Sequence, residues 1–324
     1  HQGNLLCYSD GNNVYNKRHQ LVENGSGLAG NTSSTQGVLL IPQPGNDSLI
    51  YVFTIGAVEE LLENGFKHSI LNSKANNGQG KIISKNNLLL DETYERISAV
   101  RHCNRQDVWI VVRRNNSDLY YAYLLTAAGM QPNPVISASG FVVNGDIRYN
   151  IGGMKFSGTG DRLATAFGYG LNKVELLQFN NRTGQFSNGI VFSAEHITQQ
   201  VGFPGAYGIE FSPDGRFLYV NAYLDIFSSF IYQFDATVPV ASAIIASRYI
   251  AHAETSGSGA GALQVGPDGK IYAAFRGKPS LTVIANPNAA GAACLVQPDF
   301  VSLDPSGQRR CSAGLPIFDQ GYFD

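Results

Sequence analysis

The stretch Ile209-Glu-Phe-Ser-Pro-Asp-Gly-Arg-Phe-Leu218 is one copy of a pattern that returns along the chain. The same order of residue types recurs as Leu263-Gln-Val-Gly-Pro-Asp-Gly-Lys-Ile-Tyr272. It recurs again, with a different turn, as Met154-Lys-Phe-Ser-Gly-Thr-Gly-Asp-Arg-Leu163. Three copies of one ten-residue pattern indicate an internal repeat rather than three coincidental turns.

Two weaker copies extend the repeat toward both ends of the chain. Val100 to Trp109 matches the whole pattern loosely, and Pro316-Ile-Phe318 matches only its beginning. The third position of each copy serves as an anchor, and the anchors are separated by 54, 55, 54 and 53 residues: His102, Phe156, Phe211, Val265 and Phe318. A period this constant predicts one structural unit of about 50 residues per repeat.

Each repeat contains the signals of four short antiparallel strands. In the copy around Ile209, a strand leads into the turn Pro213-Asp-Gly215, whose Asp-Gly pair predicts a two-residue hairpin, and Phe217–Asn221 follows as a second strand. Ser229–Phe234 alternates as a third strand, and Ile244–Tyr249 predicts a fourth. Four antiparallel strands per unit are typical of a β-propeller blade, so we predict an all-β propeller.

The repeat predicts a single propeller domain over residues 1–324. Units begin near residues 34, 97, 151, 205 and 260, and each supplies one blade. Residues 1–29 lack a leading strand and 314–324 supply only one, so together they predict a sixth, split blade that closes the ring. Missing upstream residues would allow seven blades. Ala57–Asn64 predicts a helix inserted in the blade that begins near residue 34.

Composition excludes several classes of protein. Among 324 residues, 15% are charged and 44% are hydrophobic, and 23 basic against 25 acidic residues leave a net charge of −2. Binding of nucleic acid through phosphate charge needs a basic surface, which this balance disfavours. The longest apolar stretches are interrupted before 18 residues, so we expect no transmembrane helix.

Cysteine spacing suggests one disulfide. Cys294 and Cys311 lie 17 residues apart in a stretch rich in loop residues, and a bond between them would join the last full repeat to the closing strand. Such a bond would indicate an oxidising compartment. The alternative is a pair of buried thiols. We expect Cys7 and Cys103 to remain free.

The chain as a whole resembles the propeller regions of large secreted surface proteins of Bacteroidetes, many of which end in gliding-motility-associated, type IX secretion sorting domains. The segments that carry the resemblance are Leu5–Gly11, Val14–Gln20, Ala99–Asn104, Tyr121–Thr126, Gly208–Gly215 and Gly314–Phe318. The resemblance implies a module of a multidomain protein that is secreted or exported across the outer membrane to the cell surface. It implies no catalytic residues. Asp47-Ser48-Leu49 also resembles the O-glycosylation triplet of that phylum, which marks Ser48 as a candidate.

The position before each anchor offers candidate channel residues. Arg101, Lys155, Glu210 and Gln264 share one phase of the repeat, so we expect their side chains to face the central channel. They form either a polar pocket for an anionic or sugar ligand, or a solvated channel with an internal ion pair.

The two functional hypotheses belong to different classes. The first is a non-enzymatic interaction or adhesion module that binds a protein or a glycan. The second is a propeller-type hydrolase or lyase acting on a sugar or lactone, which would use Glu210 with Asp146 or His102 at the channel mouth. Propeller lactonases hold a calcium ion with clustered oxygen ligands, whereas the channel phase here offers one carboxylate, Glu210, beside two cations, so we expect no cofactor, with calcium as the alternative. The sequence lacks the Gly-x-Ser-x-Gly and His-Glu-x-x-His motifs.

Overall fold

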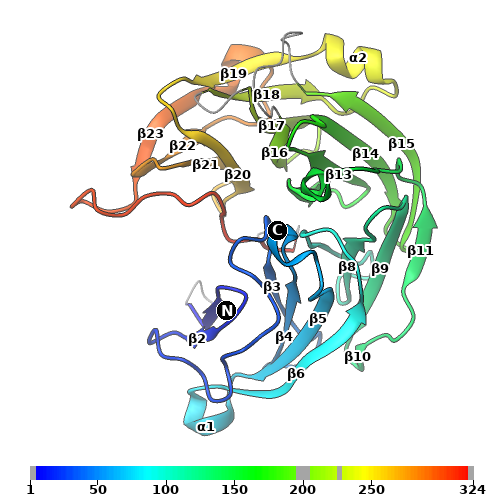
Figure 1. Cartoon of the computed structure of the whole chain (residues 1–324), viewed down its shortest axis with the longest axis vertical. Coiled ribbons are helices and arrows are strands. Elements are labelled where there is room, and N and C mark those ends of the chain that lie inside the picture. Colours follow the sequence, from blue (N-terminus) through cyan, green and yellow to red (C-terminus); the bar gives the residue numbers. More distant parts are fainter. Residues whose placement is uncertain (1–4, 195–204, 225–227, 320–324) are drawn as a thin grey trace.

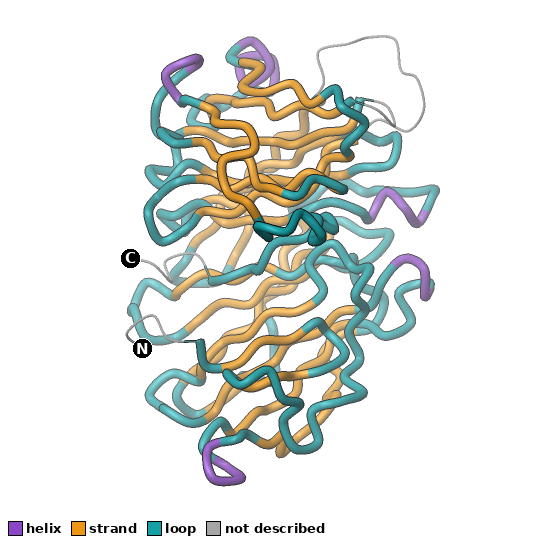
Figure 2. Tube along the Cα trace, turned by 90° about the vertical axis from the view of Figure 1, so that its left-hand side faces the viewer, coloured by secondary structure: helices purple, strands orange, loops and turns teal. Residues whose placement is uncertain are grey.

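The computed structural model describes residues 5–194, 205–224 and 228–319. In these ranges the strands form six antiparallel sheets placed around a central axis (Figure 1). Seen from the side, strands make up the middle of the molecule and loops cover both faces of the ring (Figure 2). The predicted all-β propeller is therefore confirmed.

Five sheets follow one another along the chain and are numbered here as blades 1 to 5. Blade 1 contains β3 (Val38–Pro42), β4 (Leu49–Ile55), β5 (Phe66–Asn72) and β6 (Lys81–Leu90). Blade 2 contains β7 (Ser98–Arg101), β8 (Val108–Arg113), β9 (Leu119–Thr126), β10 (Gly129–Met130) and β11 (Val135–Ala138), the last two both pairing with β9. Blade 3 contains β12 (Met154–Phe156), β13 (Arg162–Phe167), β14 (Lys173–Asn180) and β15 (Gln185–Ser193).

The last two full blades keep the same order of four strands. Blade 4 contains β16 (Gly205–Phe211), β17 (Phe217–Tyr223), β18 (Ser229–Asp235) and β19 (Tyr249–Glu254). Blade 5 contains β20 (Gly259–Val265), β21 (Ile271–Arg276), β22 (Ser280–Ile284) and β23 (Val296–Ser302). The core lies between neighbouring blades, where apolar side chains from facing sheets pack together.

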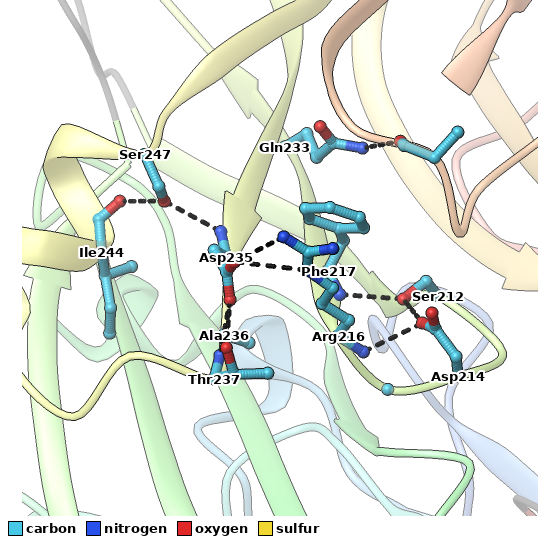
Figure 3. Close-up of polar contacts among 12 residues, drawn as sticks. Ser212, Asp214, Arg216, Phe217, Gln233, Asp235, Ala236, Thr237, Ile244 and Ser247 are labelled. Atoms are coloured by element: carbon cyan, nitrogen blue, oxygen red, sulfur yellow. Dashed lines mark hydrogen bonds and ion pairs between the residues drawn. The ribbon is translucent and has the colours of Figure 1, made fainter. Parts of the chain in front are cut away.

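The sequence Ser212-Pro-Asp-Gly215 ends the leading strand of blade 4 through a local network of hydrogen bonds (Figure 3). The Ser212 hydroxyl donates to Asp214 Oδ1 at 2.6 Å and accepts from the Phe217 N–H at 2.8 Å. Gly215 has φ 72° and its N–H donates to the Ser212 carbonyl at 2.7 Å. The turn is therefore not the predicted two-residue hairpin: Pro213 to Arg216 form a four-residue loop in which only the glycine needs positive φ.

Two local expectations are wrong. The helix expected over Ala57–Asn64 is a single 3-10 turn, η1 (Val58–Glu60), which ends where Leu61 and Leu62 take positive φ. The fourth strand expected over 244–249 begins only at Tyr249. The residues expected to start this strand belong instead to the helix α2 (Ala241–Ala246). The helix packs Ile244 against the core between blades 3 and 4. The remaining short helical elements are α1 (Ala75–Gly78), η2 (Ile147–Asn150) and η3 (Gly291–Cys294).

Both ends of the described chain meet in the sixth sector of the ring. β1 (Cys7–Ser9) pairs with β2 (Val14–Asn16), and residues 314–319 lie beside β1 across a cavity of about 550 Å³. The predicted leading strand Pro316–Phe318 is not part of a sheet, since Pro316 has no N–H to donate and Ile317 packs instead against the core of blades 1 and 2. Within the described residues no helix is long and apolar enough to cross a membrane.

Candidate binding site at the ring axis

Three of the four expected channel residues meet at the axis. Lys155 on β12 places its Nζ 3.1 Å from Glu210 Oε2 on β16, and the same amine donates to Gln264 Oε1 on β20. Each side chain is at most 8% exposed. Glu210 also accepts from the N–H groups of Phe211 and Val265, at 3.0 and 3.2 Å. This network joins the leading strands of blades 3, 4 and 5.

The channel beside this network is nearly filled. The space next to Lys155 measures about 20 Å³, and Leu315 and Ile317 from the C-terminal segment close it. A cavity of this size holds a single water molecule at most. The structure therefore shows an internal ion pair at this level of the axis rather than an open polar pocket.

The other expected residues do not join Glu210. Arg101 ends β7 in a half-buried position, and its carbonyl accepts from Asn181 Nδ2 at 3.0 Å. Asp146 caps η2 by accepting from the Arg148 N–H, and its hydrogen bonds with the Arg148 side chain lower the pKa of the carboxyl to about 2. The His102 ring lies 5.7 Å from the Trp109 ring. The acid pair expected for hydrolysis is not assembled around Glu210.

The described residues also gather no group of three or more His, Cys, Asp or Glu side chains that could hold a metal ion. Calcium needs at least six oxygen ligands, several of them usually carboxylates. The described residues therefore show no carboxylate cluster of the kind that calcium often uses.

A hollow of about 1200 Å³ opens at the axis on the face that carries η1. It is called here the axial hollow, and it is bounded by side chains from five separate parts of the chain: Asp10, Glu59, Tyr169, Tyr207, Tyr223 and Arg276. The segment Thr32–Thr35, called here its floor, and the segment Ser312–Gly314 also line it. This concave site combines charged, hydroxyl and aromatic groups around one open volume.

Three tyrosines supply the aromatic part of the axial hollow. The rings of Tyr207 and Tyr223 lie 5.8 Å apart at an angle of 70°. Tyr207 is buried and Tyr223 is half-buried, and both line the hollow. Tyr169, on another wall, has φ 51°, and the Arg148 guanidinium lies 4.0 Å from its ring centre. A non-glycine residue in the left-handed region next to a hollow is a feature often found at functional sites.

The acidic groups of the hollow come from the N-terminal third of the chain. Glu95 accepts from the Thr35 N–H at 3.0 Å, from the Thr35 hydroxyl at 2.5 Å and from the Val58 N–H at 3.1 Å. Burial raises the pKa of Glu95, and the neighbouring Glu59 acts in the same direction. The more exposed Glu59 accepts from the Ser33 hydroxyl at 2.8 Å. Glu95 therefore holds the floor of the hollow against η1, while Glu59 faces solvent.

Arg276 is the basic group of the hollow. It ends β21 opposite Gly259, and its side chain is exposed. The charge of Arg276 acts on Tyr207 and Tyr223. Burial raises the pKa of Tyr223 to about 12, and the Arg276 guanidinium opposes that rise. Burial likewise raises the pKa of Tyr207, with Glu95 adding to the rise and Arg276 opposing it. Tyr207 thus lies between the acidic and basic sides.

Sequence reasoning missed the axial hollow. One signal could have found part of it: the start of a leading strand and the end of the next strand lie at the same face of an antiparallel blade. Tyr207 near the start of β16, Tyr223 at the end of β17 and Arg276 at the end of β21 follow this rule. Glu59 and Glu95 lie outside the repeat pattern, and no comparable signal marks them.

The predicted disulfide is absent, and all four cysteines are free thiols. The Cys294 carbonyl accepts from Asn286 beyond one end of β22, whereas Cys311 Sγ lies 3.4 Å from the Ser280 carbonyl at the other end. Five strand residues separate their ends by about 13 Å, against a limit of about 7 Å between the Cα atoms of a disulfide. The two buried thiols of the alternative interpretation are what the structure shows.

The candidate O-glycosylation residue lies in the turn between β3 and β4. Ser48 is half-exposed, and both its N–H and its hydroxyl lie 2.9 Å from Asn46 Oδ1. The serine is on the surface, with its hydroxyl engaged in the turn. Its modification stays a prediction.

Comparison with known proteins shows the fold alone. Neither a protein-family model nor a curated protein matches the chain. Among solved structures, the Dos1 propeller has a TM-score of 0.52 at 11% identity, over 95% of this chain and 68% of that one. A Bacteroides uniformis protein provisionally assigned as a 6-phosphogluconolactonase has 0.49 at 12%, over 95% and 96%. The periplasmic gluconolactonase PpgL of Pseudomonas aeruginosa has 0.45 at 13%, over 97% and 96%. Identities this low carry no inference about activity.

Proposed function

We propose that this chain is a non-enzymatic binding module and that the axial hollow takes a carbohydrate chain. The observation that carries the proposal is the combination of ring faces and hydroxyl-binding groups around one open volume of about 1200 Å³. Tyrosine side chains present an apolar face and a polar hydroxyl at once, which suits sugar rings with apolar C–H faces and hydroxyl rims. Serine, threonine and carboxylate oxygens along the floor and wall can accept hydrogen bonds from those hydroxyls.

The position of the hollow supports a binding role. It is open to solvent at the mouth of the ring, so an extended polymer can cross it without threading through the closed channel below. The walls come from blades 1, 3, 4 and 5, whose strands form a rigid frame. Sites built on such a frame need little rearrangement on binding. We further propose that the module is displayed on a secreted or cell-surface bacterial protein, on the strength of the sequence resemblance.

The enzymatic alternative needs free carboxyl groups, and most carboxyl groups near the axis are already held in ion pairs or hydrogen bonds. Glu210 is paired with Lys155 and Asp146 with Arg148. Glu95 and Glu59 are the two neighbouring carboxylates of the hollow, and a raised pKa at Glu95 is the one property that favours a general acid. Since both oxygens of Glu95 already accept hydrogen bonds from the floor and from η1, we assign it a structural role.

The test combines a glycan array with calorimetry on the purified chain. Tyr223→Ala and Tyr169→Ala remove ring faces from the hollow, and we expect each to weaken glycan binding about tenfold, or about 1.4 kcal/mol. Tyr272→Ala is the matched control, because Tyr272 lies on β21 at the end opposite Arg276. Absence of any glycan binding, or equal binding by all three variants and the unmodified chain, would contradict the proposal. Turnover of a bound sugar that Glu95→Gln abolishes would favour the enzymatic alternative.

A further inference from the structure

Arg276 is set apart from the other basic side chains near it. Two residues further along the chain, Lys278 lies 3.0 Å from Glu254 and 3.5 Å from Asp299, so it compensates the acids at this end of blade 5. Across the axial hollow, Arg148 is paired with Asp146. Within the described residues Arg276 makes no ion pair and no side-chain hydrogen bond. Its guanidinium keeps all five N–H donors available in the hollow.

The backbone beside Arg276 leaves room for a ligand. Gly259 pairs with Arg276 across β20 and β21. A Cβ atom at Gly259 would lie 3.2 Å from the Tyr223 ring and 3.7 Å from the Arg276 Cβ. Any side chain larger than hydrogen would therefore occupy the approach to both residues. With glycine at this position, the face of Tyr223 and the guanidinium border one open space.

We infer that the carbohydrate bound in the axial hollow carries a carboxylate, as in a uronic-acid polymer, and that Arg276 binds this carboxylate. The inference rests on the proposed function and adds the class of ligand. The guanidinium of an arginine can donate two parallel hydrogen bonds to the two oxygens of a carboxylate. A neutral hydroxyl has a single oxygen and cannot accept this pair. The sugar ring then lies over Tyr223, next to the fork.

The acidic side of the hollow limits the charge of the ligand. Asp10, Glu59 and Glu95 all line it, so a group with two negative charges would be repelled by several carboxyl groups and attracted by one guanidinium. A uronate carries one negative charge per sugar, and its hydroxyls can donate to Glu59. The arrangement therefore favours a carboxylate over a phosphate ester.

The experiment compares matched acidic and neutral oligosaccharides by calorimetry. The probes are oligogalacturonate against galactan oligosaccharide and oligomannuronate against mannan oligosaccharide. We expect the unmodified chain to bind one acidic probe at least tenfold more tightly than its neutral partner, with the difference shrinking as salt is raised. Arg276→Gln should reduce this difference to less than about twofold, chiefly by weakening the binding of the acidic probe. Arg276→Lys should retain only part of it, because a point charge replaces the fork.

The matched control is Lys270→Gln, which removes the same charge from the other end of β21, where Lys270 pairs with Asp268 at 2.8 Å. It should keep the full preference for the acidic probe. Equal binding of acidic and neutral probes by the unmodified chain would overturn the inference and leave the proposed function in place. Equal weakening of both by Arg276→Gln, or tighter binding of a phosphorylated mannan oligosaccharide, would also overturn it. If none of the probes binds, the inference fails, and if the glycan array is also negative, the proposed function fails with it.

Discussion

Arg113 and Glu175 form a fully buried ion pair between blades 2 and 3. Arg113 Nη1 lies 3.0 Å from Glu175 Oε2, and neither side chain is exposed. Glu175 also accepts from the Tyr120 hydroxyl at 2.5 Å and from the Phe141 N–H at 2.7 Å. With both carboxylate oxygens occupied, this pair is part of the packing between two blades, and it does not reach the axial hollow.

His68 is a residue whose titration should be visible in stability. Its ring stacks on Tyr51 at 5.4 Å, and its Nδ1 is buried without a partner. Burial lowers the pKa of His68 below its ordinary value, so the unfolded chain binds the proton more readily than the folded one.

We therefore expect His68 to favour folding fully above about pH 6.5, its unfolded pKa, and to lose that contribution as pH falls through the lower folded value. Urea unfolding between pH 7.5 and 5.5 measures this loss. His68→Gln should reduce the pH dependence. His19→Gln is the control, since His19 is exposed. An unchanged slope in His68→Gln would contradict the assignment.

At the scale of elements, each blade combines a local turn with a long-range contact. The Ser-Pro-Asp-Gly turn of blade 4 closes through hydrogen bonds among neighbouring residues, so its geometry depends mainly on its own sequence. The leading strands then converge on the axis, where the distance between two strands depends on how their blades pack. Gly208 on β16 and Gly261 on β20 mark the closest approach, because a Cβ on Gly208 would lie 2.1 Å from the Gly261 carbonyl oxygen.

Gly208→Ala should force these two leading strands apart. Overpacking of this kind costs about 1–3 kcal/mol, and we expect a loss in that range in urea unfolding. Gly314→Ala is the control, since a Cβ at Gly314 meets no atom within 4 Å, and it should change stability by less than about 0.5 kcal/mol. Equal stability of the two variants would show that β16 and β20 do not pack as described.

Cys294 and Cys311 lie near opposite ends of β22. Because Cys294 and Cys311 lie too far apart to bond, adding a reductant should leave the melting temperature unchanged, and denatured protein should titrate four thiols. Mass mapping of alkylated peptides checks the assignment directly. A Cys294–Cys311 peptide pair in freshly purified protein would show that this part of blade 5 is misplaced.

At the scale of the molecule, the ring is joined at its axis by the Lys155 network and at its edge by the two ends of the chain. Lys155, Glu210 and Gln264 bring together strands that are more than 50 residues apart in sequence. Leu315 and Ile317 cover this network from the C-terminal segment. The axial hollow lies beyond this closed section, so its shape depends on all of these blades keeping their places.

Lys155→Met should leave the Glu210 carboxylate buried without its cation. Loss of one partner of a buried pair costs about 3–5 kcal/mol, which we expect to appear as a lower urea midpoint. Adding Glu210→Gln to Lys155→Met removes the uncompensated charge and should recover at least about 1 kcal/mol. If the double variant is less stable than Lys155→Met alone, the two residues do not compensate each other.

The amino-acid sequence by itself determined the blade plan of this protein, because the information is local. Alternating strands, turn residues and a constant period depend on neighbours along the chain, so the propeller follows from them. The common repeat phase also placed Lys155, Glu210 and Gln264 together. The extent of η1 and α2 was decided instead by packing against neighbouring blades, which can override local helix and strand preferences.

Only the tertiary structure decided the axial hollow, the free thiols and the form of the sixth sector. Glu59, Tyr207 and Arg276 belong to three different blades, and nothing in their sequence neighbourhoods shows that their side chains border one volume. The distance between Cys294 and Cys311 depends on the direction of β22, which the 17-residue spacing does not contain. Contacts of this kind arise when rigid sheets close into a ring, and the ring geometry, rather than the spacing along the chain, sets which side chains meet.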